Sequence, residues 1–207
     1  MGLCCGLCDF CGNLSRIVIL TLTIAGVVLQ GYAAFYQCEF LNYDVDASGG
    51  GAGGGGGSGT FGFYGYKLPG EDDECTPYGT EEMDADRMLK AARSMVILAL
   101  AAACAAGTLV LFEFLFCKVC CAGCLEGLGY VVATVCSALG YLAYASEFCN
   151  YTFGEDDNGN GTTMGISATS SCSFGKGATY NLLAMAAYFA SSVVLACTPQ
   201  PTPLFRK

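Results

Sequence analysis

The sequence predicts an all-α membrane protein: a bundle of four transmembrane helices with two disulfide-closed outer loops, the first of which could hold short β-strands. Only 13% of its 207 residues are charged and 54% are hydrophobic, whereas soluble domains usually carry about 25% charged residues. Four apolar runs approach the ~20 residues that cross a ~30 Å hydrocarbon core. They are 17–35, 94–116, 128–146 and 180–197. Helices packed together in water need a polar face, which these runs lack.

Composition excludes several classes of function. The chain has no histidine, so histidine general bases, histidine metal ligands and haem ligation by histidine are ruled out. A net charge of -9 argues against nucleic-acid binding, which needs a basic surface. We therefore expect a non-enzymatic protein with no catalytic residues, no cofactor, no metal and no nucleic-acid partner.

A short cysteine-rich segment, 1–15, precedes the first span, 16–37. Cysteines beside a span are common S-acylation sites, and the four assigned here are Cys4, Cys5, Cys8 and Cys11. Unmodified thiols and a zinc site remain open, because the last two have the CxxC spacing of zinc ligands. The N-myristoylation motif has Ser or Thr at position 6, whereas this chain has Gly6, which argues against that modification. The apolar run is longer than a signal-peptide core and follows a single cation, Arg16, which favours a retained span.

The first loop, 38–80, contains Cys38 at its start and Cys75 towards its end. The glycine tract between them, 48–59, is costly to order, so it is either a flexible linker or a surface that another molecule covers. It is not a phosphate-binding loop, because no Gly-Lys-Ser/Thr follows it. The Tyr and Phe residues of this region suit an aromatic belt at the membrane interface or a protein-contact surface equally well.

The second span, 81–117, is expected to begin outside the bilayer. Thr80 can cap it, and acidic residues in the first turn interact favourably with the helix dipole. Glu113 is the one formal charge within the four apolar runs, and an intramembrane acid is functional by default. We expect it to reach the interface or to pair with Lys118, since no other span supplies an acid or base for a relay. Glu113 supports an alternative function, a small transporter or channel, or a channel accessory subunit.

A cytosolic turn, 118–127, links the second and third spans. Its cysteine-rich sequence predicts acylation at Cys117, Cys120, Cys121 and Cys124. The same residues form two CxxC patterns typical of thiol-redox motifs. These patterns are predicted to face the reducing side, which argues against a redox enzyme.

The second loop, 148–178, lies between the third span, 128–147, and the fourth span, 179–198, and a tail follows at 199–207. Two glycosylation sequons in this loop begin at Asn150 and Asn160.

Small residues recur every four positions on three of the spans, as in the third-span stripe of Gly129, Ala133 and Ser137. Such stripes allow close helix contact in lipid, either within the bundle or against a partner.

The distribution of charge and cysteine sets the orientation. Lysine and arginine are nearly balanced between the two sides, so the positive-inside rule does not decide it. Most of the acids, both sequons and an even number of cysteines lie in the two loops, which places the loops outside and both termini in the cytosol. An oxidising exterior then predicts one disulfide in each loop, Cys38–Cys75 and Cys149–Cys172. A cross-loop pairing, such as Cys38 with Cys172, remains the alternative.

This layout resembles the claudin/PMP22 and MARVEL (occludin- and synaptophysin-like) tetraspan families. A cysteine pair in each outer loop is similar to the synaptophysin pattern, and the Gly/Tyr-rich stretch 49–66 is similar to occludin. The claudin tryptophan signature is absent, since the chain has no tryptophan. The resemblance implies a structural, adhesion or assembly role in the plasma membrane or another secretory-pathway membrane of a eukaryote. The expected partners are the lipid bilayer and other membrane or extracellular proteins, including copies of the same chain in an array.

Overall fold

The computed structural model describes residues 2–35, 38–45, 57–67, 75–78, 87–115, 122–145, 149 and 170–197. Over these residues the chain is mostly helical, with one small β-sheet and two disulfides. Contacts divide the chain into two compact units, described separately below. The bundle unit comprises Met1–Tyr32, Ser94–Leu139 and Tyr180–Lys207, and the sheet unit comprises Ala33–Arg93 and Gly140–Thr179.

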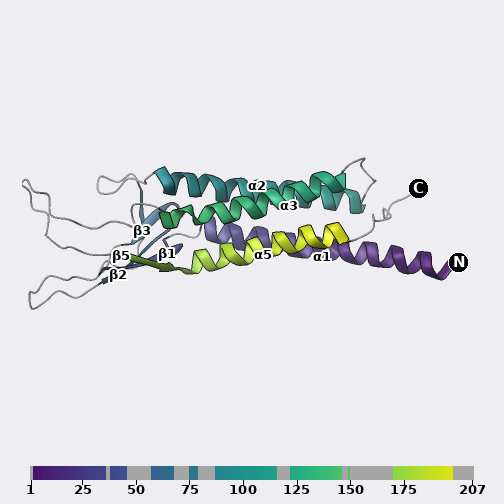
Figure 1. Ribbon diagram of the computed structural model, residues 1–207, viewed down its shortest axis with the longest axis horizontal. Helices are drawn as coiled ribbons and strands as arrows, with labels where there is room; N and C mark the ends of the chain where they lie inside the picture. The colour runs from purple at the N-terminus through teal and green to yellow at the C-terminus, as the bar shows by residue number, and fades with distance from the viewer. Residues whose placement is uncertain are drawn as a thin grey trace, which may run out of the picture. The chain divides into compact units, whose positions relative to one another are not determined.

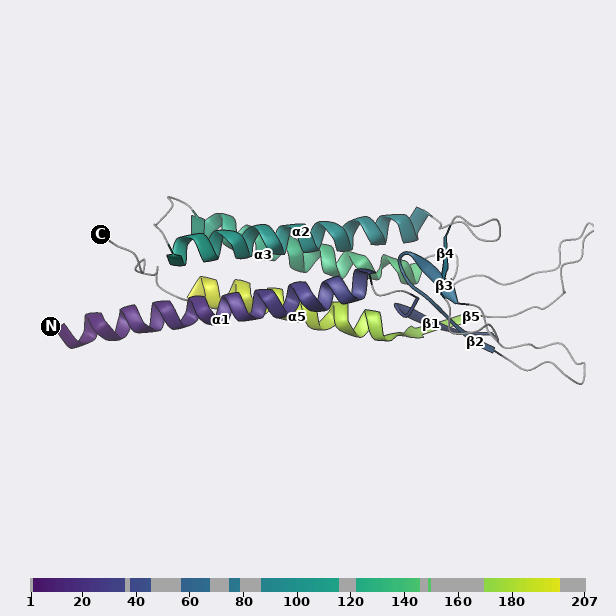
Figure 2. The ribbon, with the colours of Figure 1, turned by 180° about the vertical axis from the view of Figure 1, so that it is seen from behind.

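Four long helices, α1, α2, α3 and α5, run alongside one another (Figures 1 and 2). Their bounds are Gly2–Phe35 for α1, Arg87–Leu115 for α2, Ala122–Leu139 for α3 and Lys176–Cys197 for α5. A 3₁₀ helix, η1 (Gly140–Ala145), continues α3. Helices α1, α2 and α5, and α3 together with η1, each contain a segment long and apolar enough to cross a membrane. This confirms the prediction of four candidate spans.

Two helix boundaries differ from the predicted ones. Helix α1 begins at Gly2, so the backbone of the cysteine-rich segment is helical and continuous with the first span. Helix α3 begins at Ala122, inside the predicted turn 118–127. The second difference matters most, because it places Glu126 within a helix rather than in a cytosolic turn. The expected start of the second helix, at 80–86, lies outside the described residues.

The bundle core is built from small residues and two tyrosines. Ala103, Ala106, Ala133, Tyr130 and Tyr188 are among the buried residues that form one apolar cluster between the helices. A Cβ added at position 129 would lie 2.8 Å from the Cβ of Ala106, so α2 and α3 touch where α3 has glycine. The small-residue stripe of α3 therefore packs inside the bundle, which answers the question that the sequence left open.

The sheet unit contains five antiparallel strands in the order β4-β3-β2-β1-β5. Their bounds are Leu41–Val45 for β1, Gly57–Phe61 for β2, Gly65–Lys67 for β3, Thr76–Pro77 for β4 and Ser170–Phe174 for β5. Four strands come from the first loop, where short strands were expected. The fifth comes from the second loop and pairs with β1, with Leu41 opposite Phe174. The two loops thus form one sheet.

Aromatic side chains form much of the core of the sheet unit. Phe40, Phe61, Phe63 and Tyr66 are all almost completely buried. The ring centroids of Phe40 and Phe63 lie 4.2 Å apart. The sequence suggested a membrane-interface belt or a partner surface for the aromatic residues of this region. These four instead pack within the unit itself.

Candidate functional sites

Buried polar residues recur along α1 at intervals of seven. Arg16, Thr23 and Gln30 are 4%, 4% and 0% exposed. Seven residues make close to two turns of an α-helix, so the three side chains share one face. Each makes a hydrogen bond to α3, and these three side chains and their partners Glu126, Tyr130 and Ser137 are called the polar ladder below.

The first rung of the ladder is charged. Arg16 Nη1 donates a hydrogen bond to Glu126 Oε2 at 2.5 Å, and Nη2 donates to Glu113 Oε2 at 3.1 Å. The three side chains are 4%, 0% and 7% exposed. We call Arg16, Glu113 and Glu126 the charge triad, which joins α1, α2 and α3 by a single guanidinium between two carboxyl groups.

The charge triad corrects two expectations about Glu113. It was predicted to reach the interface or to pair with Lys118; its side chain is buried and pairs with Arg16, whereas Lys118 lies outside the described residues. It was also predicted to have no acid or base in another span, yet Arg16 and Glu126 both lie within candidate spans. The error arose because the apolar runs were bounded at residues 17 and 128, just beyond these two charges. The seven-residue spacing of polar residues in α1 could have revealed the ladder.

The middle rung joins two hydroxyl groups. Thr23 Oγ1 lies 2.6 Å from the hydroxyl oxygen of Tyr130, which is fully buried. Thr23 also donates to the carbonyl oxygen of Ile19 at 2.7 Å, which leaves Tyr130 as the donor between the two hydroxyls. The Thr23 hydroxyl is well accommodated in an apolar bundle because it both donates a hydrogen bond, to Ile19, and accepts one, from Tyr130.

The third rung is a closed network of three fully buried side chains from α1, α3 and α5. Gln30 Nε2 donates to Asn181 Oδ1 at 3.0 Å, and Ser137 Oγ donates to Gln30 Oε1 at 2.9 Å. Asn181 Nδ2 donates to the Ser137 carbonyl oxygen at 3.0 Å, which closes the ring. Such a network is satisfied in only one relative register of the three helices, so it specifies how they pack.

Among the described residues of the bundle unit, three side-chain atoms are buried without a hydrogen-bond partner. They are Asn13 Oδ1, Glu126 Oε1 and the hydroxyl oxygen of Tyr188. The Tyr188 ring lies against α1 at Gly26, where an added Cβ would come within 2.5 Å of it. The first rung therefore differs from the third, because its charged groups are not all satisfied.

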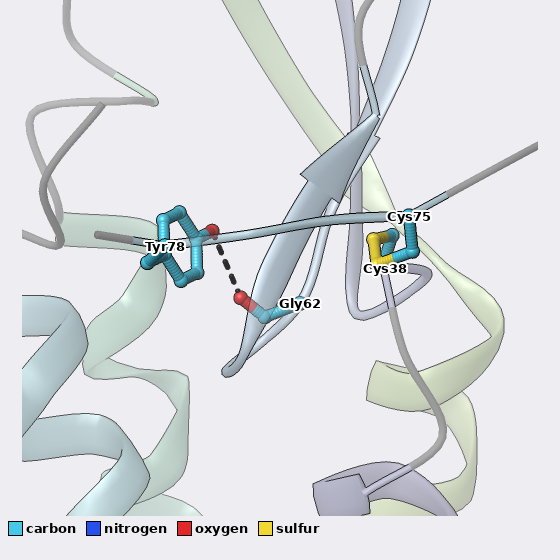
Figure 3. The surroundings of a disulfide bond; sticks show 4 residues. All are labelled: Cys38, Gly62, Cys75 and Tyr78. Carbon is cyan, nitrogen blue, oxygen red and sulfur yellow. Dashed lines mark hydrogen bonds between the residues drawn. A yellow bond between two sulfur atoms is a disulfide. The ribbon is translucent and has the colours of Figure 1, made fainter. Parts of the chain in front are cut away.

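Two disulfides brace the sheet unit. Cys38 is bonded to Cys75 and Cys149 to Cys172, the within-loop pairs that the sequence predicts. Figure 3 shows the first bond beside the hydrogen bond from the Tyr78 hydroxyl to the Gly62 carbonyl oxygen, which spans 3.0 Å. The covalent link joins the residue before β4 to Cys38, which precedes β1, and the hydrogen bond holds Tyr78 against the turn between β2 and β3.

The second disulfide acts on the other edge of the sheet. Cys172 lies in β5, directly opposite Tyr43 of the neighbouring strand β1. Just beyond β5, the amide of Gly175 donates to the Phe40 carbonyl oxygen at 3.1 Å, and the amide of Gly177 donates to the Glu39 carbonyl oxygen at 2.8 Å. An added Cβ at position 175 would lie 2.8 Å from the Phe40 oxygen, so only glycine fits this close approach.

Most predicted modification sites fall outside the described residues. Nothing is described of Cys117, Cys120, Cys121, Asn150 or Asn160, nor of the side chains of the four N-terminal cysteines. Cys124 is described and lies exposed in α3 as a free thiol. The thiols of Cys104 and Cys197 are also free and exposed.

The chain matches no protein-family model, and no curated protein matches it. A functional assignment therefore depends on the geometry of the ladder and of the sheet unit.

Proposed function

We propose that this chain is a non-enzymatic tetraspan membrane protein that acts as a structural, adhesion or assembly partner through its sheet unit. One observation carries the proposal: strands from both inter-helix segments, β1 and β5, pair in a single sheet, and each segment is closed by its own disulfide. In this proposal the sheet unit lies outside the cell or in the lumen of a secretory-pathway membrane, and both termini are cytosolic.

The shape of the sheet unit supports a binding role. Disulfides and an aromatic core brace the described strands, so a partner would not have to order these strands on binding. Among the described strands, β4 and β5 form the edges. Strand β4 is two residues long and includes Pro77, which lacks a backbone donor, so it is a poor template for a further strand. Strand β5 is five residues long and carries no charged residue, which suits contact with another protein.

The charge triad supports a structural reading of the bundle. An intramembrane acid usually indicates transport, but Glu113 has a fixed partner in Arg16, and the third rung holds α1, α3 and α5 in register. A bundle tied at both levels is suited to a structural role. Acylation of the cysteines at the cytosolic end and glycosylation of the second loop belong to the same proposal.

The assembly role is tested by cross-linking on intact membranes. The exposed Lys176 provides an amine in the sheet unit for a membrane-impermeant reagent. We expect cross-linked oligomers or a defined partner from the wild-type chain in mild detergent. The double variant Cys149→Ser/Cys172→Ser should lose them, while Cys104→Ser, which alters a free thiol of α2, should retain them. Recovery of monomer alone from wild-type membranes at every reagent concentration would rule out the assembly role.

A second candidate function is the movement of protons or ions. The observation that favours it is the polar ladder, which places buried polar groups at three levels of the bundle. Purified protein in liposomes should then pass protons or cations, and Glu113→Gln should reduce the flux at least severalfold. Equal flux in the wild-type chain, the variant and empty liposomes would remove this candidate.

A further inference from the structure

We infer that the charge triad is a proton-binding site: it holds one proton, shared between the carboxyl groups of Glu113 and Glu126, so that the buried cluster is electrically neutral. The inference concerns the bundle unit and does not depend on the role proposed for the sheet unit.

The first argument is the number of charges. The Arg16 guanidinium keeps its proton in proteins and contributes one positive charge. It contacts two carboxyl groups through its two Nη atoms. Without a proton these would contribute two negative charges. Arg16 is the one cation in contact with them among the described residues, so one negative charge would be left uncompensated there, among side chains that are 7% exposed or less. An uncompensated charge in a low-dielectric interior is very costly, whereas one bound proton balances the cluster.

The second argument is independent and comes from a single atom. Glu126 is completely buried, and its Oε1 accepts no hydrogen bond while Oε2 accepts one from Arg16. A buried carboxylate oxygen without a donor is an unfavourable arrangement. A carboxylic acid with its proton on this oxygen becomes a donor, and Glu113, whose carboxyl group contacts the same guanidinium, is a charged group that interacts with Glu126. Proton uptake forms one O–H bond on the carboxyl pair and breaks none in the protein.

Among the described residues, the other titratable groups do not change the assignment of the proton to Glu113 and Glu126. Tyr130, four positions after Glu126 on α3, uses its hydroxyl in the middle rung with Thr23. Helix α5 carries one charged residue, Lys176, at its first position, and one free thiol, Cys197, at its last. Helix α2 carries Arg87, Lys90 and Arg93 in its first seven residues and Glu113 three positions from its end.

Infrared spectroscopy of the purified full-length chain in lipid bilayers tests the inference directly. A protonated carboxyl group has a C=O band that a carboxylate lacks, and this band shifts in heavy water. We expect a band equivalent to one carboxylic acid per chain at neutral pH. Glu113→Gln and Glu126→Gln should each abolish it, because each leaves one carboxylate for one guanidinium. Glu39→Gln, which changes an exposed acid paired with Lys176, should leave it unchanged.

A second measurement covers the case in which a variant does not fold. Unfolding the wild-type chain in a denaturing detergent at neutral pH should release one proton per chain, detected with an indicator dye in weak buffer. A wild-type spectrum without the acid band, a band that survives in both folded glutamine variants, or an unfolding reaction that releases no proton would each overturn the inference.

Discussion

Arg16 Nη1 on α1 donates a hydrogen bond to Glu126 Oε2 on α3 at 2.5 Å, although the two residues are 110 positions apart in the sequence. Both side chains are buried, and the same guanidinium also contacts Glu113. The contact therefore sets the relative positions of three helices at one level of the bundle.

Replacing Arg16 by methionine should destabilise the bundle strongly. The change leaves two buried carboxyl groups with no cation, and breaking a buried ion pair on one side costs about 3–5 kcal/mol. Glu126→Gln keeps the size of the side chain and leaves one carboxylate for one guanidinium, so its cost should be about 1 kcal/mol or less. Equilibrium unfolding in mixed micelles measures both values. Equal costs for the two variants would show that the triad does not hold the helices together.

Replacing Asn181 by leucine should loosen the third rung. The substitution removes the acceptor of Gln30 and the donor to the Ser137 carbonyl oxygen. Hydrogen bonds between membrane helices contribute about 0.6 kcal/mol on average and about 1.7 at most, so a loss of about 1–2 kcal/mol is expected from the same unfolding assay. Ser192→Ala is the control on the same helix, because that hydroxyl bonds only to its own helix at Phe189. If Asn181→Leu and Ser192→Ala have the same free energy of unfolding, the hydrogen-bond network of the third rung does not stabilise the bundle.

Two glycines of α1 should respond in opposite directions to alanine. At Gly26 an added Cβ would lie 2.5 Å from Tyr188 Cε1, in a ring that is itself fully buried. Overpacking of this kind costs about 1–3 kcal/mol. At Gly31 nothing lies within 4 Å of an added Cβ, and alanine is favoured over glycine in a helix by about 1 kcal/mol. Thermal melts should place Gly26→Ala below the wild type and Gly31→Ala at or above it; the reverse order would contradict the packing.

Removing the second disulfide should release strand β5. The bond closes a separation of 23 residues in the sequence, for which the loss of unfolded-state entropy predicts about 3–4 kcal/mol. Cys149→Ser/Cys172→Ser should therefore increase amide exchange in β1 and β5, while the bundle helices stay protected. Hydrogen exchange with mass spectrometry reads both regions in one experiment. Unchanged exchange in β5 would mean that backbone pairing with β1 holds the strand without the covalent bond.

The four candidate spans and the two disulfides could be read from the sequence because each rests on a local signal. An apolar run of about 20 residues is visible without knowledge of its neighbours, and two cysteines in one loop can pair in a single way within that loop. The first loop also contains short strands, as expected.

The ladder and the fifth strand could not be predicted in this way because their partners are far apart in the chain. Arg16 finds Glu113 at a separation of 97 residues, and β1 pairs with a strand that begins at Ser170. The charged residues Arg16, Glu113 and Glu126 lie near the ends of apolar runs, where a position at the membrane interface accounts for a charge as well as a buried ion pair does. The burial of Phe61 and Phe63 was missed because aromatic side chains suit an interface as well as a core.

The position of β1 between β2 and β5 imposes an order on the biogenesis of the protein. Its pairing with β2 can form as soon as the first loop has been synthesised. Its pairing with β5 must wait until α2 and α3 have been made and residues 170–174 have emerged. Until then the nascent chain carries a half-paired strand, and the thiol of Cys149 has no partner to bond with. The sheet can therefore be completed only after α2 and α3 have been synthesised. A chain stalled before Ser170 would expose the unpaired edge of β1, which a quality-control system could recognise.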